Sequence, residues 1–181
     1  MNVMGVSGLP GSGKNLVSKI AEERLMHVIN MGDLVRLEAK KRNEETGKTA
    51  VDLRKEQGEY VLAKLSVEKI KDTSNFNDSK IEDFFIIEGI RSPFEVKLFK
   101  KSFKDFKLLS IFSSPKTRFN RLKNRKRDDD FQNYEDFLKR DKRELDFGIG
   151  DVIATSDFII INEEGLDEYK AQINNFFDEI I

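Results

Sequence analysis

The sequence contains no cysteine and only one histidine among its 181 residues. The absence of cysteine excludes disulfide bonds and thiolate chemistry, and it fits a cytoplasmic protein. A single histidine argues against a metal site built from imidazole ligands. We interpret His27 as an ordinary surface residue at the start of a strand.

The sequence also lacks an excess of either charge sign and has no long apolar run. Lys and Arg number 32 and Asp and Glu number 33, which gives a net charge of −1. Such a balanced charge does not favour binding to nucleic acid or to an anionic membrane surface. No apolar run approaches the length of a membrane span, and we expect the apolar N-terminal segment to be a strand rather than a signal peptide.

The fractions of hydrophobic and charged residues indicate a folded protein with a solvated surface. Hydrophobic residues make up 38% of the chain, 15 of them Phe, and charged residues make up 36%. There is no internal repeat and no low-complexity segment. A chain of this length can bury a sizeable core, so we expect residues 1–181 to form a single domain.

The most specific motif is a phosphate-binding loop at residues 8–15, which read GLPGSGKN. The pattern G-x-x-x-x-G-K-[ST] is complete except for its last position, where Asn15 replaces a hydroxyl residue. The glycines let backbone N–H groups face a phosphate, and Lys14 supplies a positive charge. We predict that a nucleoside triphosphate binds to Gly8, Leu9, Pro10, Gly11, Ser12, Gly13, Lys14 and Asn15.

The residues around the loop alternate between strand and helix patterns. Apolar residues precede the loop, and apolar residues at helical spacing follow it. Further strands are predicted at Val28–Met31, Phe84–Ile87, Leu108–Phe112 and Phe158–Ile161, with helices between them. This alternation predicts an α/β fold: a five-stranded parallel sheet with helices on both faces, in three layers.

Local signals also predict several helix boundaries. Ser92, Pro93 and Glu95 have the order of a helix cap, a first-turn proline and a capping-box glutamate. A helix is predicted at Gly32–Lys41, and a loop at Asn43–Lys48. Thr49 and Asp52 then resemble a capping box that opens a long helix reaching Lys71. Residues 72–80 have the composition of a connector.

Polar residues follow the second and third strands, at the sheet edge where the phosphate loop also lies. Asp33 and Arg36 fall on one face of a helix, and we expect both to converge on this edge of the sheet. The alternative interpretation is that Asp33 only favours the helix dipole and that Arg36 is an exposed arginine. Glu88 can organise Mg²⁺ through water, and Arg91 can bind a phosphate bidentately. For Glu88 the alternative is an edge carboxylate paired with a lysine.

A third cluster of cations lies between residues 116 and 143. Arg118, Arg121 and Arg125 share one face of a predicted helix, and Arg140 and Arg143 share a face of the next. We predict that Arg127, Arg140 and Arg143 cover the transferring phosphoryl group and stabilise its developing charge. A solvated charged face is the alternative. Aromatic residues do not alternate with these arginines, which weighs against nucleic-acid binding.

These motifs together resemble the nucleoside monophosphate kinases. Gly32-Asp33-Leu34-Val35-Arg36 is similar to the segment with which adenylate kinases hold the acceptor phosphate. Glu88-Gly89-Ile90-Arg91 is similar to their acid-Gly-x-Pro-Arg segment, and residues 127–143 to their lid. Residues 156–166 resemble dephospho-CoA kinases, in which a comparable loop borders the adenine. Over nearly its full length, with residues 148–154 included, the chain is most similar to an uncharacterised archaeal P-loop family between these two kinases.

The resemblance implies a kinase-like fold with an acceptor-side insertion at about 43–70 and a lid at about 126–140. It implies ATP and Mg²⁺ as cofactors, Asn162 beside the nucleotide, and Asn15 and Glu88 near the metal. Asp33, Arg36 and Arg91 would hold the acceptor. Asn15 departs from the family pattern, and so does Met31, where adenylate kinases carry a hydroxyl residue near the acceptor base.

Three functions follow from this sequence. The first is a kinase that transfers the γ-phosphoryl group of ATP to a small phosphorylated acceptor, a nucleoside monophosphate or a molecule like dephospho-CoA. The second is a nucleotide-driven switch or assembly ATPase with a protein or ribonucleoprotein partner. The third is a nucleotide-binding protein with little or no catalysis. The second arginine pair favours the first function, since a simple ATPase needs no acceptor clamp.

Overall fold

The structure is a computed structural model that describes residues 2–75, 84–125 and 133–180. Within these residues, five parallel strands form one sheet in the order β2-β3-β1-β4-β5. This confirms the predicted sheet. The strands are β1 (Asn2–Ser7), β2 (His27–Asn30), β3 (Phe84–Ile90), β4 (Lys107–Phe112) and β5 (Phe158–Ile161).

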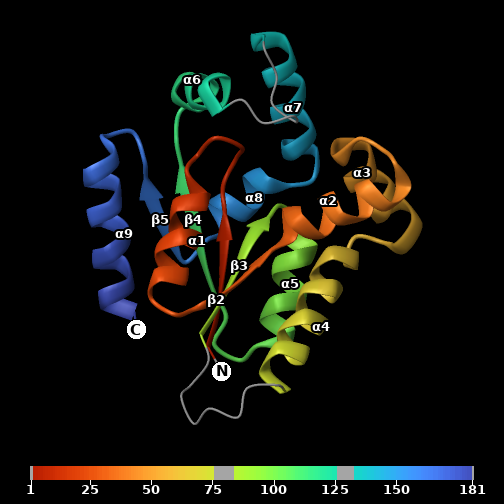
Figure 1. Cartoon of the computed structure of the whole chain (residues 1–181), viewed down its shortest axis with the longest axis horizontal. Coiled ribbons are helices and arrows are strands. Elements are labelled where there is room, and N and C mark those ends of the chain that lie inside the picture. The colour runs from red at the N-terminus through yellow and green to blue at the C-terminus, as the bar shows by residue number, and fades with distance from the viewer. Residues whose placement is uncertain (1, 76–83, 126–132, 181) are drawn as a thin grey trace.

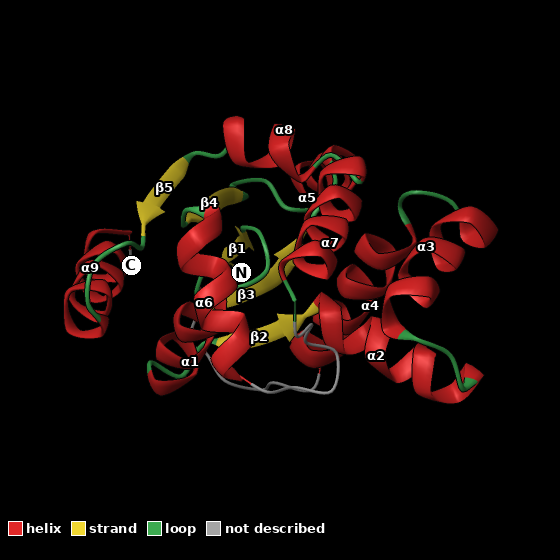
Figure 2. Ribbon diagram, turned by 90° about the horizontal axis from the view of Figure 1, so that it is seen from above, coloured by secondary structure: helices red, strands yellow, loops and turns green. Residues whose placement is uncertain are grey.

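Helices cover both faces of the sheet (Figures 1 and 2). Helices α1 (Lys14–Glu23) and α9 (Leu166–Ile180) pack on one face. Helices α4 (Val61–Asn75), α5 (Pro93–Ser102) and α8 (Ile149–Ala154) pack on the other. Among these helices and the others in the described part of the chain, none is both long and apolar enough to cross a membrane.

Strand β3 shows how the sequence builds the two core layers. Phe85 and Ile87 belong to the core on the α4 and α5 side, whereas Ile86 belongs to the core on the α1 and α9 side. All three side chains are fully buried. Alternate residues of a strand point to opposite faces, so a continuous apolar run is required where both faces are covered.

The remaining helices surround the carboxyl ends of the strands. Helices α2 (Met31–Arg42) and α3 (Thr46–Gln57) lie on one side, and α6 (Pro115–Arg125) and α7 (Tyr134–Asp146) lie above the sheet (Figure 1). Both termini lie at the opposite end of the molecule. From β1 the chain crosses to β2 on one side of the sheet, whereas from β3 it crosses to β4 on the other side. The direction of the connections reverses between β1 and β3, and a crevice at such a point is a common ligand site.

The predicted long helix after Thr49 is wrong in two respects. Gly58 has φ +85°, which ends α3 and separates it from α4. Helix α3 also begins earlier, at Thr46, so part of the predicted loop at Asn43–Lys48 is helical. Thr49 does not cap the helix; its hydroxyl donates to the carbonyl of Glu45 at 3.1 Å. The glycine at residue 47 favoured the loop prediction, although the helix accommodates it.

Other boundaries differ by a few residues. Strand β2 ends at Asn30, and Met31 begins α2, because the Asn30 side chain caps the helix by accepting from the Asp33 N–H at 3.2 Å. Helix α4 continues to Asn75, into the predicted connector, the rest of which lies outside the described residues. The capping box at Ser92 is confirmed: its hydroxyl accepts from Phe94, and Glu95 accepts from the Ser92 N–H at 3.2 Å.

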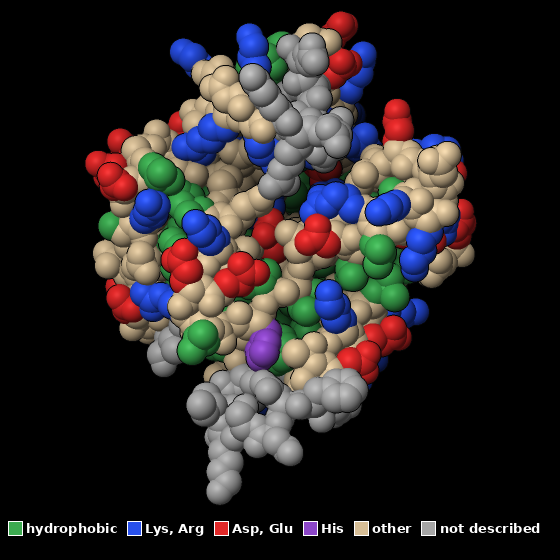
Figure 3. Space-filling model, viewed as in Figure 1, with side chains coloured by type: hydrophobic (Ala, Val, Ile, Leu, Met, Phe, Trp, Pro, Cys, Tyr) green, Lys and Arg blue, Asp and Glu red, His purple; other side chains and the backbone are tan. Residues whose placement is uncertain are grey.

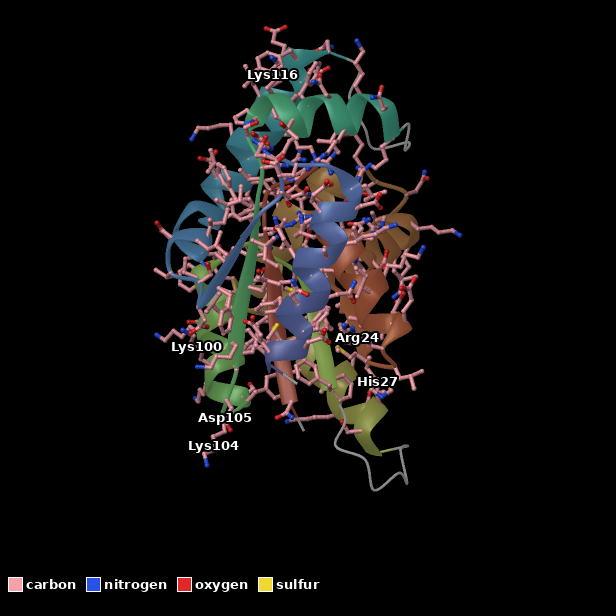
Figure 4. The ribbon with its side chains drawn as sticks, turned by 90° about the vertical axis from the view of Figure 1, so that its left-hand side faces the viewer. Arg24, His27, Lys100, Lys104, Asp105 and Lys116 are labelled. Carbon is pink, nitrogen blue, oxygen red and sulfur yellow. The ribbon has the colours of Figure 1, made fainter. Side chains whose placement is uncertain are left out.

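The predicted position of His27 is confirmed, with one addition. It is the first residue of β2, and its ring stacks on Phe85 with centroids 4.8 Å apart. Figure 4 places His27 and Arg24 at one end of the molecule and Lys116, on α6, at the other. The histidine therefore lies far from the sheet edge that carries the phosphate loop.

Candidate nucleotide and acceptor site

The predicted phosphate loop connects β1 to α1 at the crevice. Its backbone carbonyls are held from behind by side chains distant in sequence. Asn162 donates to the Ser12 carbonyl at 2.8 Å, and Arg118 donates to the Pro10 carbonyl at 3.2 Å. The Tyr169 hydroxyl donates to the Gly13 carbonyl at 3.1 Å, and burial raises the pKa of this phenol, which keeps its proton. These bonds fix the loop before any ligand binds.

Two glycines of the loop allow this close packing. Gly13 has φ +104°, and a Cβ atom there would lie 2.4 Å from the Asn162 amide nitrogen. Gly8 has φ +141°, and a Cβ atom there would lie 2.4 Å from the backbone oxygen of Ile111. Any other residue at these two positions would clash with neighbours that hold the loop.

Lys14 folds back over the loop. Its ammonium group donates to the carbonyls of Gly8, at 2.8 Å, and Leu9, at 3.4 Å. Burial lowers the pKa of Lys14 to about 8, and the nearby Glu88 carboxylate opposes this effect. A bound polyphosphate would favour the charged form, because it places further negative charge beside the ammonium.

The two predicted metal residues, Glu88 and Asn15, line the same cavity. Glu88 is buried and accepts a hydrogen bond of 2.5 Å from the Ser18 hydroxyl, one turn after Lys14. Asn15 is exposed on the first turn of α1. Within the described residues, no group of three His, Cys, Asp or Glu residues could hold a metal ion. A divalent cation here would therefore need water or phosphate oxygens as further ligands.

The cavity at the phosphate loop, which we call the donor cavity, has a volume of about 230 Å³. Arg121 and Arg125 of α6 form one wall. The sequence placed both on one helix face but gave neither a role, because spacing alone does not show which face meets the loop. Asn162 does not line this cavity; it lies behind the loop and accepts from Arg121 at 3.0 Å.

Arg118, from the same helix, is a buried residue rather than a solvated one. Its side chain is 1% exposed and forms a bidentate pair with Asp141 of α7, with one contact of 2.7 Å. The guanidinium also donates to the Ser113 carbonyl at 3.1 Å and lies over the Phe137 ring. Together with its bond to Pro10, this makes Arg118 the link between α7 and the phosphate loop.

A second cavity of about 680 Å³, which we call the acceptor cleft, lies between α2, α3 and α7. Gly32, Arg36, Arg91 and Arg140 line both cavities, so the two spaces adjoin. On the face shown in Figure 3, Lys and Arg side chains are spread among Asp and Glu side chains, and several lie near the centre. Asp33 lines neither cavity; it pairs with Arg36, whose Nε lies 3.0 Å from the Asp33 carboxylate.

Arg91 is held by two carboxylates that the sequence did not connect with it. Its guanidinium contacts Glu144 of α7 at 3.1 and 3.2 Å, and Glu144 is 2% exposed. Its backbone N–H donates to Glu95 at 2.8 Å. Glu95 also pairs with buried Arg54 of α3, at 2.7 Å. The orientation of Arg91 therefore depends on α3, α5 and α7 together.

The predicted lid arginines are only partly described. Arg127 lies outside the described residues, as does most of the loop before α7. Arg140 lines both cavities, at their junction. Arg143 lines only the acceptor cleft.

Comparisons with known proteins place this arrangement in a class. Residues 7–137 match the family described as AAA domain. A shikimate kinase from Bacteroides thetaiotaomicron superposes with a TM-score of 0.64 over 99% of this chain and 98% of its own, at 16% identity. Shikimate kinase from Acinetobacter baumannii, solved with shikimate, gives 0.62 over 99% and 93%, at 10% identity. The fold is thus that of the kinase-like P-loop proteins, a class that typically binds nucleotide and Mg²⁺.

More similar sequences identify the family. A UPF0200 protein of Methanothermobacter thermautotrophicus is 52% identical over 172 residues, which cover 95% of this chain and 87% of that protein. One from Pyrococcus furiosus is 41% identical, covering 98% and 97%. The chain belongs to the UPF0200 family, as the resemblance to an archaeal P-loop family predicted.

Proposed function

We propose that this protein is a kinase that transfers the γ-phosphoryl group of ATP to a small phosphorylated acceptor, a nucleoside monophosphate or a molecule like dephospho-CoA. One observation carries the proposal: the donor cavity opens into a larger cleft, and Arg36, Arg91 and Arg140 line both. A protein that only hydrolyses ATP needs no second cationic cleft beside the phosphate loop.

In this reaction, the residues that line the two cavities have separate roles. Lys14 and the loop N–H groups bind the β- and γ-phosphates of the donor. An acceptor oxygen attacks the γ-phosphorus, the bond to the β–γ bridging oxygen breaks, and ADP leaves. A phosphate oxygen attacks as the anion, whereas an attacking hydroxyl releases its proton to solvent. Arg140, at the junction of the cavities, stabilises the charge of the transferring group. Positioning and electrostatics supply most of the catalysis in such reactions.

Magnesium fits the residues of the donor cavity. Glu88 offers a buried carboxylate and Asn15 an amide oxygen, and Mg²⁺ often takes one or two protein oxygens with water and phosphate. When bound, the ion neutralises phosphate charge. Ser18 keeps Glu88 oriented through its 2.5 Å hydrogen bond.

The acceptor clamp proposed from the sequence is Asp33, Arg36 and Arg91. Arg36 and Arg91 are already paired with carboxylates, so an acceptor phosphate would have to displace Asp33 and share Arg91 with Glu144. This exchange is feasible for Arg36, which is partly exposed. For Arg91 the buried Glu144 keeps the guanidinium in place and leaves part of its edge to face the cleft.

The test is a transfer assay with radiolabelled ATP, Mg²⁺ and a panel of nucleoside monophosphates and dephospho-CoA. Lys14→Ala serves as the inactive control. Labelled product from at least one acceptor, lost in the variant, supports the kinase. Hydrolysis of ATP with no transfer to any acceptor overturns it.

A second function, a nucleotide-driven switch or assembly ATPase, is favoured by Asn15 and by the paired state of Arg36 and Arg91. It requires slow hydrolysis that a protein or ribonucleoprotein partner accelerates. An ATPase measurement before and after addition of a fraction that co-purifies with the protein separates the two functions.

A further inference from the structure

The acceptor cleft is lined by side chains of both charges. Four are the carboxylates Glu44, Glu45, Asp136 and Glu144, and five are the cations Arg36, Arg91, Lys139, Arg140 and Arg143. Three of these pair with carboxylates of the protein, namely Arg36 with Asp33, Arg91 with Glu144 and Lys139 with Asp136. Arg140 is engaged as well.

Arg143 differs from the other four. In residues 2–75, 84–125 and 133–180, no hydrogen bond or ion pair is formed by its guanidinium. The residue is nevertheless partly buried. A partly buried charge without a partner is unfavourable, and an anion from a ligand would offset that cost.

The guanidinium of Arg143 lies beside α3. A Cβ atom at Gly47 would lie 2.6 Å from Nη1 of Arg143 and 3.0 Å from Cζ. The guanidinium therefore lies against Gly47, where no side chain intervenes. Arg143 and Gly47 both line the acceptor cleft, so the guanidinium lies on the cleft wall.

Arg143 also lies away from the point of transfer. It lines the acceptor cleft but not the donor cavity, whereas Arg36, Arg91 and Arg140 line both. A group bound to Arg143 thus occupies the part of the cleft remote from the phosphate loop. In the described part of the chain no aromatic ring lines either cavity, whereas cations line both.

We propose that Arg143, seated on Gly47, binds a second anionic group of the acceptor, a carboxylate or a phosphate, remote from the oxygen that receives the phosphoryl group. The acceptor is then a molecule with two anionic ends. This inference rests on the proposed kinase function, because only a kinase has an acceptor. Anion binding at Arg143 can nevertheless be measured without phosphoryl transfer.

Calorimetric titration of the full chain tests the site. The phosphate loop is first saturated with Mg²⁺ and adenylyl imidodiphosphate, and binding of that analogue is recorded separately. Citrate then probes for carboxylates and pyrophosphate for phosphates. In addition, 3-phosphoglycerate is compared with glycerol 3-phosphate, which lacks the carboxylate.

The variant is Arg143→Gln, and its matched control is Lys142→Gln, which removes an exposed cation that pairs with Asp146 outside the cleft. We expect Arg143→Gln to weaken binding of citrate or pyrophosphate about tenfold or more, as the loss of a charged hydrogen bond does, with Lys142→Gln unchanged. Gly47→Ala keeps the charge and only moves the flexible guanidinium, so it should weaken binding less than Arg143→Gln does. Alanine favours a helix, so this variant should fold.

Equal affinities for Arg143→Gln and Lys142→Gln, or no binding of any probe to the wild-type protein, would overturn the inference. Failure of the kinase proposal looks different. In that case no acceptor is phosphorylated, while the loss of anion binding in Arg143→Gln persists.

Discussion

Replacing Arg118 by Met should destabilise the protein strongly, although Arg118 is a charged residue on a helix rich in basic residues. Its side chain is 1% exposed and donates to the carbonyls of Ser113 and Pro10 and to both oxygens of Asp141. The variant leaves a mostly buried carboxylate unpaired. Breaking such a pair from one side costs about 3–5 kcal/mol. That is a large part of the stability of a typical domain, about 5–15 kcal/mol.

The assay is thermal unfolding followed by circular dichroism, supported by urea titration. For a chain of this size each kcal/mol shifts the melting temperature by about 2–4 °C, so we expect a fall of about 6–20 °C. The control is Lys142→Met, which removes a lysine from the surface pair with Asp146, where both side chains are more than half exposed. Surface pairs contribute about 0–1 kcal/mol, so this variant should change little.

A second substitution distinguishes the ion pair from simple packing. Adding Asp141→Leu to Arg118→Met removes the unpaired carboxylate, and buried pairs replaced on both sides by apolar residues are often tolerated. The double variant should therefore be more stable than Arg118→Met alone. The reasoning is refuted if Arg118→Met loses no more stability than Lys142→Met, or if the double variant recovers nothing.

Four further results are expected. Affinity for adenylyl imidodiphosphate should fall as the pH rises above about 8, because Lys14 with its lowered pKa then loses its charge, and titration of Lys14→Met should lack this step. Ser18→Ala should raise several-fold the Mg²⁺ concentration needed for half-maximal nucleotide binding, without changing metal-free binding, because Glu88 loses the hydrogen bond from Ser18. Asn15→Ser should change kinase turnover less than tenfold; a much larger gain would instead favour a nucleotide-binding protein with little natural catalysis. Gly58→Ala should destabilise by about 1–2 kcal/mol in urea titration, since φ is +85° there, and an unchanged midpoint would contradict the strain argument.

The parts of the fold that could be predicted from the sequence are those with local signals. The phosphate loop, the apolar strands and the Ser92 capping box each lie within a few residues, and the structure contains all of them. The break at Gly58 has a local signal too, a glycine within a helical pattern. It was missed because an isolated glycine is often tolerated within a helix.

The partners of the site residues could not be predicted in this way. Arg118 and Asp141 are 23 residues apart, Arg54 and Glu95 are 41 apart, and Arg91 and Glu144 are 53 apart. Each pair joins two helices or a strand end and a helix, so it exists only once the chain has packed. Periodicity places a charge on a helix face, but it does not show which carboxylate meets which arginine.

Helix α7 contributes the carboxylate of two of these pairs, Arg118–Asp141 and Arg91–Glu144. Asp141 and Glu144 are three residues apart, so they lie on neighbouring parts of one helix surface. Asp141 holds Arg118, which holds the phosphate loop at Pro10, and Glu144 holds Arg91, which lines both cavities. A displacement of α7 along its axis would strain both ion pairs at once. Helix α7 therefore helps to position both the phosphate loop, which Asn162 and Tyr169 also hold, and the acceptor cleft. A substitution that loosens one pair should disturb the geometry of both sites.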